Sequence, residues 1–364
     1  MKTLNEKGVA VVMALSVVLI MATAALQLHG NERSNMLNAA AMRDRATLEQ
    51  MTASGIHVAM AVLVKDRIDS ETDSLQEDWA DPATMATLLG QFPFDDGAMN
   101  VKIFDELGKI QINALIHHNS DPDSGSSSEF NTSQRDLWMR LSSNMLSALE
   151  ILGDDMPDME ETDSLTIINC IKDWLDKDED LITGLSGAES DYYEELDPPY
   201  ACKNGPFDHI SEVRLVKGIT PELFNGFGEM GGLGDYITVY GAQAEDDQKF
   251  DYPGTININT APYAVLSALM SEGSEDAATL LIDHREAVSG NQYTNDLTSE
   301  SWYTSVPGVN FADTDMITIS SDVFRIIATA ELNGVMATTT AIIKREQESE
   351  TSSWKCKVLN WKTE

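Results

Sequence analysis

Acidic side chains alternate with other residues in one short segment, where Asp176, Asp178 and Asp180 follow one another at every second position. Alternate carboxylates of this kind converge on a hard cation in calcium-binding loops. The segment is not an EF-hand, because Leu181 takes the place of the required glycine and Gly187 the place of the final glutamate. The spacing therefore predicts a calcium site of another geometry.

Two further carboxylates, Glu189 and Asp191, follow soon after this segment, and a ligand from either of them would complete the shell. Neither His nor Cys alternates with the acids, so the oxygen ligands favour calcium over zinc. The alternative interpretation is a solvated acidic loop whose like charges repel one another.

Two cysteines, Cys170 and Cys202, stand on either side of the acidic segment. In an oxidising compartment they are the favoured candidates for a disulfide bond that closes the acidic loop. A bond from either of them to Cys356 is the other possibility. The alternative interpretation is a pair of unrelated, small hydrophobic side chains.

Signals for enzymes and nucleotide-binding proteins are weak in this sequence. Residues 226–231 match G-x-G-x-x-G, but that motif binds a dinucleotide only between a strand and a helix. Here a helical pattern precedes it and more glycines follow, so we interpret it as a mobile glycine loop. The sequence contains no H-E-x-x-H, C-x-x-C or G-x-S-x-G motif, and we expect no enzymatic activity.

The chain of 364 residues carries a formal net charge of −36. Nucleic-acid-binding surfaces gain affinity from Lys and Arg, so this balance argues against nucleic acid as a partner. An Ile-x-Ile-Asn pattern at 110–113 returns at 256–259, and a Val-Pro-Gly-Val turn lies at 306–309. These patterns resemble helix-hairpin-helix modules, and their acidic surroundings indicate the packing geometry without DNA binding.

The N-terminal region combines Lys2 and Lys7 with an uncharged apolar stretch at 9–26. Such a stretch nearly crosses a bilayer, and the lysines before it place the N-terminus in the cytoplasm. Three interpretations compete. A secretory signal would be cleaved near Ala24, a plain anchor would stay whole, and a prepilin-type leader would be cut after Gly8 and keep the apolar helix.

The residues that follow favour the prepilin-type leader. Leu37, Leu48, Met51, Val58 and Val62 recur at helical steps, and no proline occurs from residue 9 to residue 81. One helix from about residue 9 to residue 64 would be about 80 Å long. Cleavage at Ala24 would discard much of this helix.

The pattern predicts an α+β fold: a long N-terminal helix with an antiparallel sheet, interrupted by a large, mostly helical insertion. Asn333-Gly334 predicts a tight hairpin, and Gly108 a second turn. The expected strands are 101–104, 110–113, 323–331, 335–343 and 354–361. The expected parts are a leader at 1–8, a membrane segment at 9–28, a discontinuous domain at 29–113 and 318–364, and an insertion at 114–317 with modules at about 114–215 and 216–317.

The order of several motifs resembles the K-type minor pseudopilins of type II secretion systems. Lys7-Gly8 precedes the apolar stretch, and Met13 stands where ordinary pseudopilins have a glutamate. The other matching segments are 108–113, 173–178, 187–189, 204–207, 212–219, 238–241 and 256–262.

The resemblance implies a pilin-like domain whose insertion contains two SAM-like modules. It implies cleavage by prepilin peptidase after Gly8, N-methylation of Val9, and a single pass through the inner membrane with the bulk in the periplasm. It also implies that the insertion binds calcium, and it carries this property onto the acidic residues Asp176, Asp178, Glu189, Asp180 and Asp191. The implied partners are the I-type and J-type minor pseudopilins and, through them, the major pseudopilin.

A place at the tip of the pseudopilus, with roles in starting assembly and in export of folded proteins, follows from the same resemblance. In a filament, the missing glutamate would neutralise the N-terminal amine of the preceding subunit, and a carboxylate without a partner inside a membrane is costly. Met13 suits a subunit with nothing above it. The alternative is an exported acidic binding protein with a cleaved signal and helix-hairpin-helix-like modules of the DNA-uptake type.

Overall fold

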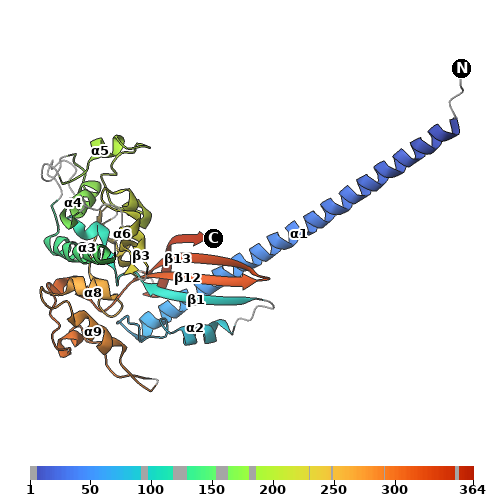
Figure 1. The fold of residues 1–364 in the computed structure, drawn as a ribbon. Coiled ribbons are helices and arrows are strands. Elements are labelled where there is room, and N and C mark those ends of the chain that lie inside the picture. The colour runs from blue at the N-terminus through green and yellow to red at the C-terminus, as the bar shows by residue number, and fades with distance from the viewer. Residues whose placement is uncertain are drawn as a thin grey trace.

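The molecule consists of a long helical stalk, a small sheet domain around one end of the stalk, and a helical crown beyond the sheet (Figure 1). The computed structural model describes residues 6–91, 97–117, 129–152, 163–179, 186–228, 230–246, 249–290, 292–348 and 352–364. We call the segment between the first and second sheet strands the crown. This architecture confirms the predicted α+β fold with its long N-terminal helix and antiparallel sheet.

Helix α1 (Glu6–Asp69) has a free half and a packed half. Every side chain from residue 8 to residue 39 is exposed, whereas Leu48, Met51 and Ile56 are buried. Gly55 marks a close approach to the sheet, because a Cβ atom there would lie 2.8 Å from Cγ2 of Val101. The packed half thus fixes the direction in which the free half leaves the molecule.

The sheet is antiparallel, in the order β1-β12-β13-β14. Asn333 and Gly334 have φ values of 53° and 76° and form the tight turn between the second and third strands, which confirms the predicted hairpin. Helix α2 (Pro82–Leu89) lies beside the sheet and is capped by Asp81. The strands are β1 (Ala98–Asp105), β12 (Val323–Leu332), β13 (Val335–Gln347) and β14 (Trp354–Thr363).

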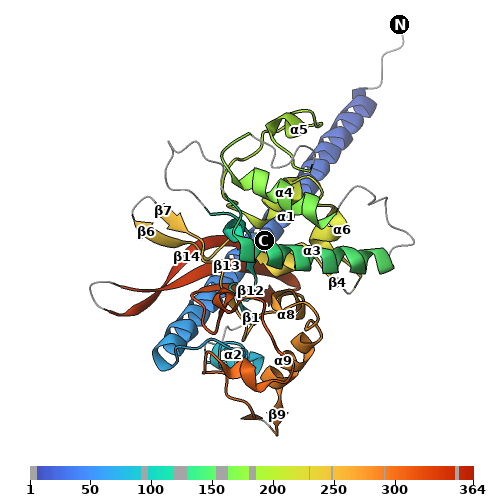
Figure 2. The same ribbon diagram turned by 90° about the vertical axis from the view of Figure 1, so that its left-hand side faces the viewer.

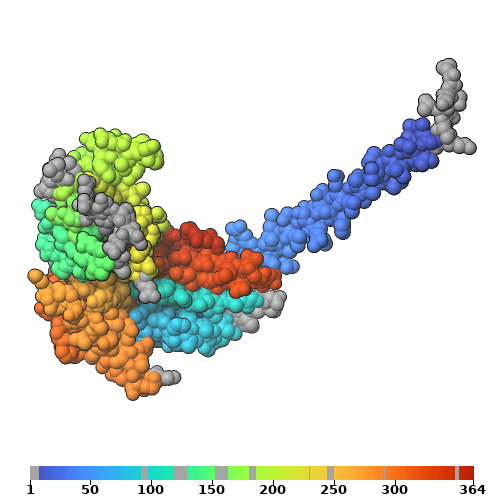
Figure 3. Space-filling view, viewed as in Figure 1, coloured from blue at the N-terminus to red at the C-terminus, as the bar shows by residue number. Residues whose placement is uncertain are grey.

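The crown has two lobes that share one continuous hydrophobic core (Figure 3). One lobe contains α3 (Thr132–Leu152), α4 (Ser164–Leu175), α5 (Ser190–Glu194), α6 (Pro221–Asn225), α7 (Leu233–Tyr236) and the 3-10 helices η1 (Ile112–Leu115) and η2 (Ile210–Leu215). The other lobe contains α8 (Tyr263–Leu269), α9 (Ala277–Glu286), η3 (Trp302–Ser305) and η4 (Thr314–Met316). In Figure 2, which faces the crown, the first lobe lies above the second.

The sequence repeat corresponds to a structural repeat. β2 (Ile110–Gln111) pairs in parallel with β5 (Ile237–Thr238), and β8 (Ile256–Asn257) pairs in parallel with β11 (Ile317–Thr318). In both lobes an Ile-Thr strand therefore pairs with an Ile-x-Ile-Asn segment. This pairing places β5 in the first lobe. The division of the insertion into modules at about 114–215 and 216–317 stays a prediction.

The expected hairpin between 101–104 and 110–113 is wrong. β1 pairs with β12, and the chain after Gln111 turns into η1 because the Gln111 side chain accepts hydrogen bonds from the backbone N–H groups of Asn113 and Ala114. The remaining short strands are β3 (Gly226–Phe227), β4 (Met230–Gly231), β6 (Gln243–Asp246), β7 (Lys249–Asp251), β9 (Val288–Ser289) and β10 (Gln292–Tyr293).

The segment that matches G-x-G-x-x-G forms the tight hairpin of β3 and β4, with a helix before it. A Cβ atom on Gly226, whose φ is 82°, would lie 2.1 Å from the carbonyl oxygen of Met230. The glycine thus permits a close approach of two backbone segments. The described residues of this segment form a hairpin, and its mobility stays a prediction.

Candidate functional site

Helix α4 carries the first acidic residues into the core of the crown. The Asp163 side chain caps its N-terminus by accepting a hydrogen bond from the Thr166 N–H at 2.6 Å. At its C-terminus, the Asp176 N–H donates to the carbonyl oxygen of Lys172 at 2.9 Å. Asp173 and Asp176 are both 0% exposed. Buried charges of this kind are costly unless they are paired or bind a cation.

The segment that precedes α5 lies against α4 through side-chain hydrogen bonds. Asp173 Oδ2 accepts from the Ala188 N–H at 2.9 Å, and Asn169 Nδ2 donates to Ser186 Oγ at 2.8 Å. These contacts bring Glu189, the residue before α5, to the C-terminal end of α4. Two stretches of sequence thereby place carboxylates at one point.

Asp176, Asp178 and Glu189 each offer a carboxylate oxygen, and these oxygens all lie within 4.8 Å of one another. Asp176 Oδ1 and both oxygens of Glu189 are buried and accept no hydrogen bond. Lys172 brings one ammonium group, 2.5 Å from Asp176 Oδ2. We call these three acids together with Lys172 the crown cluster.

The crown cluster holds its carboxylates under conditions that disfavour their charge. Burial, and then the charges of Asp173 and Asp176, raise the pKa of Glu189 to about 8. Burial raises the pKa of Asp173 to about 7, and it raises the pKa of Asp176 to about 6 although Lys172 opposes the shift. Calcium is bound by oxygen ligands, and the free oxygens of Asp176 and Glu189 are available to it. Asp176, Asp178 and Glu189 are therefore fitted to hold a calcium ion.

The structure thus brings together Asp176, Asp178 and Glu189 of the five predicted ligands. Asp191 is exposed on α5 and is not one of the grouped acids among the described residues. Asp180 lies outside the described residues. Gly8 and Val9 lie on the exposed half of α1. Calcium, leader cleavage and methylation all stay predictions.

Cys170 and Cys202 are buried thiols in the same core as the aromatic side chains that support the crown cluster. The Cys202 thiol donates to the carbonyl oxygen of Asp173 at 3.5 Å. Burial raises the pKa of Cys170 to about 12. The Trp174 ring packs edge-on against Tyr193, with centroids 5.2 Å apart. The disulfide bond between the two cysteines stays a prediction.

A second group of acids was not predicted from the sequence. Oxygens of Asp66, Asp73 and Glu77 also lie within 4.8 Å of one another. Arg345, from β13, donates to Asp66 Oδ2 at 3.0 Å and forms a buried ion pair with Asp73. We call these four residues the stalk cluster. No local pattern could have revealed it, because its cation comes from the opposite end of the sequence.

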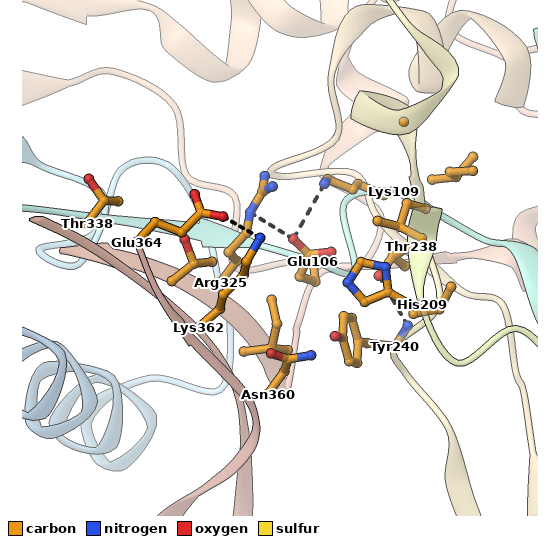
Figure 4. Close-up of a pocket in the computed structure, with 16 residues that line it drawn as sticks. Glu106, Lys109, His209, Thr238, Tyr240, Arg325, Thr338, Asn360, Lys362 and Glu364 are labelled. Carbon is orange, nitrogen blue, oxygen red and sulfur yellow. Dashed lines mark hydrogen bonds and ion pairs between the residues drawn. The ribbon is translucent and has the colours of Figure 1, made fainter. Parts of the chain in front are cut away.

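A pocket of about 230 Å³ lies between the sheet and the first lobe (Figure 4). Glu106 stands there between Lys109 and Arg325, with ion-pair distances of 3.4 and 3.1 Å. At the other side of the pocket, Lys362 forms an ion pair with Glu364. The charged side chains that line the pocket are thus paired with one another. The ion pairs of Glu106 link Lys109, at the start of the crown, to Arg325 in the sheet.

Comparison with known proteins addresses the identity of the chain. Residues 108–228, which contain the crown cluster, match the family model for protein K of the type II secretion system. Over this region the chain is similar to protein K of type II secretion systems. Protein K of Aeromonas hydrophila is 29% identical over 164 residues, covering 45% of this chain and 44% of the relative. Protein K of Klebsiella pneumoniae is 24% identical over 221 residues, covering 60% of each chain.

The chain spans about half the length of the curated protein K relatives that it matches. A chain in the crystal structure of the GspK-GspI-GspJ complex from enterotoxigenic Escherichia coli has a similar fold, with a TM-score of 0.57 and 18% identity. The match covers 89% of this chain and 99% of that chain. The likeness supports the α+β fold with its long N-terminal helix, antiparallel sheet and helical content.

Proposed function

We propose that the chain is a non-enzymatic minor pseudopilin that caps the tip of the periplasmic type II secretion pseudopilus. In this role it starts assembly and supports the export of folded proteins across the outer membrane. The observation that carries the proposal is the contrast between the two ends of the molecule. One end is a bare helix with every side chain from residue 8 to residue 39 exposed, and the other end is a broad crown (Figure 3).

The bare helix suits a stalk that packs beside other stalks. The exposed stretch of 8–39 is about 48 Å long, and its apolar part is long and hydrophobic enough to cross a membrane. The crown is too broad to stack inside a filament of such stalks. A subunit with this shape fits the end of a filament, in the inner membrane during assembly and with its bulk in the periplasm.

The leader is expected to be cut after Gly8 by prepilin peptidase, and Val9 to be methylated. Both residues lie on α1, whose apolar stretch continues beyond the cut without interruption. The mature protein would then begin inside the helix. Met13, which replaces the usual glutamate, is 64% exposed on the free half of α1.

The proposed partners are the I-type and J-type minor pseudopilins and, through them, the major pseudopilin. Their support is the likeness of the fold to a chain of a GspK-GspI-GspJ complex. The proposal includes calcium in the crown cluster and the division into a domain at 29–113 and 318–364 with an insertion at 114–317.

Intact-mass analysis of the full chain from its native host tests the processing. The expected N-terminus is a methylated Val9. A chain that begins near residue 25 would instead support an exported protein with a cleaved secretory signal. It would overturn the proposal that the apolar helix is kept as a stalk.

Labelling of assembled pseudopili tests the tip. A small epitope tag after Glu364, detected by gold-labelled antibody, is expected at one end of each filament. The same tag on the major pseudopilin is the control and should label the whole shaft. Tagged copies of this chain along the shaft would overturn the cap.

A further inference from the structure

The ammonium group of Lys172 lies inside the crown cluster. Lys172 stands one helical turn before Asp176 on α4, and its Nζ lies 2.5 Å from Asp176 Oδ2. The two side chains are only 6% and 0% exposed. A lysine is seldom buried so deeply without a specific reason.

This lysine satisfies only part of the cluster. Asp176 Oδ1 and both oxygens of Glu189 are still buried without a hydrogen bond. One ammonium supplies a single positive charge, whereas three carboxylates meet at this point, with oxygens within 4.8 Å of one another. Lys172 is thus an incomplete counter-ion for this group of acids.

A second favourable contact for the Lys172 ammonium lies nearby. Its Nζ lies 5.8 Å from the ring centroid of Phe130, which packs against the same core. The face of an aromatic ring attracts an ammonium group. The side chain can therefore leave Asp176 and still keep a favourable contact.

We propose that Lys172 is a built-in counter-ion of the crown cluster that calcium displaces from Asp176. The inference rests on the calcium proposal and deepens it. A calcium ion takes six to eight oxygen ligands, so it competes with the ammonium for the Asp176 carboxylate in addition to binding the oxygens that the ammonium leaves unpaired. The lysine holds the acids together when calcium is absent and lowers the affinity of the site for calcium.

The test compares calcium binding by the full chain in detergent, measured by isothermal titration with calcium chloride. The Lys172→Met variant removes the competing charge and keeps a long apolar side chain. We expect it to bind calcium at least about tenfold more tightly than the unaltered chain. The matched control is Lys177→Met, which removes the same charge from an exposed lysine between Asp176 and Asp178. We expect a smaller change in calcium affinity than in Lys172→Met.

A third variant, Lys172→Arg, keeps the positive charge and adds donors. It is expected to bind calcium no more tightly than the unaltered chain. Circular dichroism without calcium shows whether each variant is folded. Equal or weaker calcium affinity in a folded Lys172→Met variant would overturn the inference.

A measurement on the unaltered chain does not depend on any variant folding. Brief labelling with an amine-reactive acetyl ester, read by mass spectrometry, reports the access to each lysine. Calcium chloride is expected to raise labelling of Lys172, because its amine is released from the ion pair with Asp176, whereas Lys203, which pairs with Asp208 and Glu212, serves as the reference. Tight calcium binding with unchanged Lys172 labelling would overturn displacement.

The outcomes also separate this inference from the proposed function. If neither the unaltered chain nor Lys172→Met binds calcium, the metal proposal and the counter-ion role both fall. The tip location is judged separately, by the N-terminal mass and the filament labelling.

Discussion

The stalk cluster and the crown cluster contain the same kind of acidic group in two different settings. In each, oxygens of three carboxylates lie within 4.8 Å of one another. The stalk cluster receives Arg345, whose guanidinium reaches both Asp66 and Asp73. The crown cluster receives Lys172, whose ammonium reaches Asp176. Arginine offers five donors in a fixed fork, whereas lysine offers a single point of charge. The carboxylates of the stalk cluster are therefore more fully paired than those of the crown cluster.

The surroundings of the stalk cluster add hydrogen bonds to its charged groups. Asp73 Oδ2 accepts from the Ser321 N–H at 2.8 Å, and Arg345 also donates to the carbonyl oxygen of Ser321 at 2.6 Å. Asn257, from the second lobe of the crown, donates to the carbonyl oxygen of Asp73 at 3.0 Å. The stalk cluster is therefore a permanent joint between stalk, sheet and crown. The crown cluster keeps buried oxygens without hydrogen bonds, and our proposal is that it takes a cation from solution.

Removal of Arg345 is the strongest test of this contrast. We expect Arg345→Met to lower the free energy of unfolding by about 3–5 kcal/mol, because it leaves two carboxylates buried without their cation. Urea unfolding of the full chain in detergent, followed by tryptophan fluorescence, measures the loss. Calcium is expected not to restore it.

The matched control for that variant is Arg67→Met. Arg67 lies on α1 close to the stalk cluster, donates to the carbonyl oxygen of Glu71 and stacks on Trp354. Its loss is expected to cost less than about 1 kcal/mol, as for a partly exposed charge. Equal losses in the two variants would show that the buried joint contributes no more than the surface does.

Removal of calcium should affect the crown and spare the stalk. Calcium at a hundred times its dissociation constant stabilises a folded state by about 2.7 kcal/mol. EGTA is therefore expected to lower the thermal midpoint and to speed amide exchange at 163–179 and 186–194, with little change in β12. Calcium should reverse the effect and magnesium should not. Equal changes in both regions, or none, would contradict the assignment.

The crown cluster was predictable because its acids lie close together in the sequence. Alternation placed Asp176 and Asp178 in one loop, and Glu189 follows eleven positions after Asp178. The choice of Glu189 over Asp191 was not predictable, because it depends on the Asp173 contact that sets where α5 begins. Lys172 was also missed, since a lysine at this spacing is common on exposed helices.

The fold was predictable wherever local chemistry decides it. The apolar stretch and the helical stripe gave α1, and Asn333-Gly334 gave the last hairpin, since both positions take a positive φ. The stalk cluster depends instead on Arg345 meeting Asp66 and Asp73, which are remote in sequence. The pairing expected between 101–104 and 110–113 failed for a similar reason, because Ile110 pairs with Ile237 from a distant part of the chain.

Substitution of Glu189 sharpens the comparison within the crown. Glu189→Gln removes one negative charge from buried oxygens and is expected to weaken calcium binding about tenfold. Asp191→Asn is the matched control, because it removes the same charge two residues later from an exposed side chain. Its effect on calcium affinity, measured by isothermal titration, should be much smaller. Equal weakening would place Asp191 in the site as well.

The smallest expected effect is the pH dependence of the calcium contribution. Glu189, Asp173 and Asp176 have raised pKa values of about 8, 7 and 6 in the folded chain. Because the folded state then binds more protons than the unfolded state, stability in EGTA should rise as the pH falls from 8 to 5. Calcium needs the same carboxylates without protons, so the stabilisation by calcium should shrink over that range.

The difference between calcium and EGTA at each pH isolates the crown cluster. Asp66 and Asp73 also have raised pKa values, of about 6 and 7, because they are buried. Their contribution is the same with and without calcium and cancels in the difference. Urea unfolding at pH 8 and pH 5, each with calcium and with EGTA, therefore gives the answer. A calcium contribution that is equal at both pH values would mean that the ion binds elsewhere, and that the crown cluster keeps its protons instead.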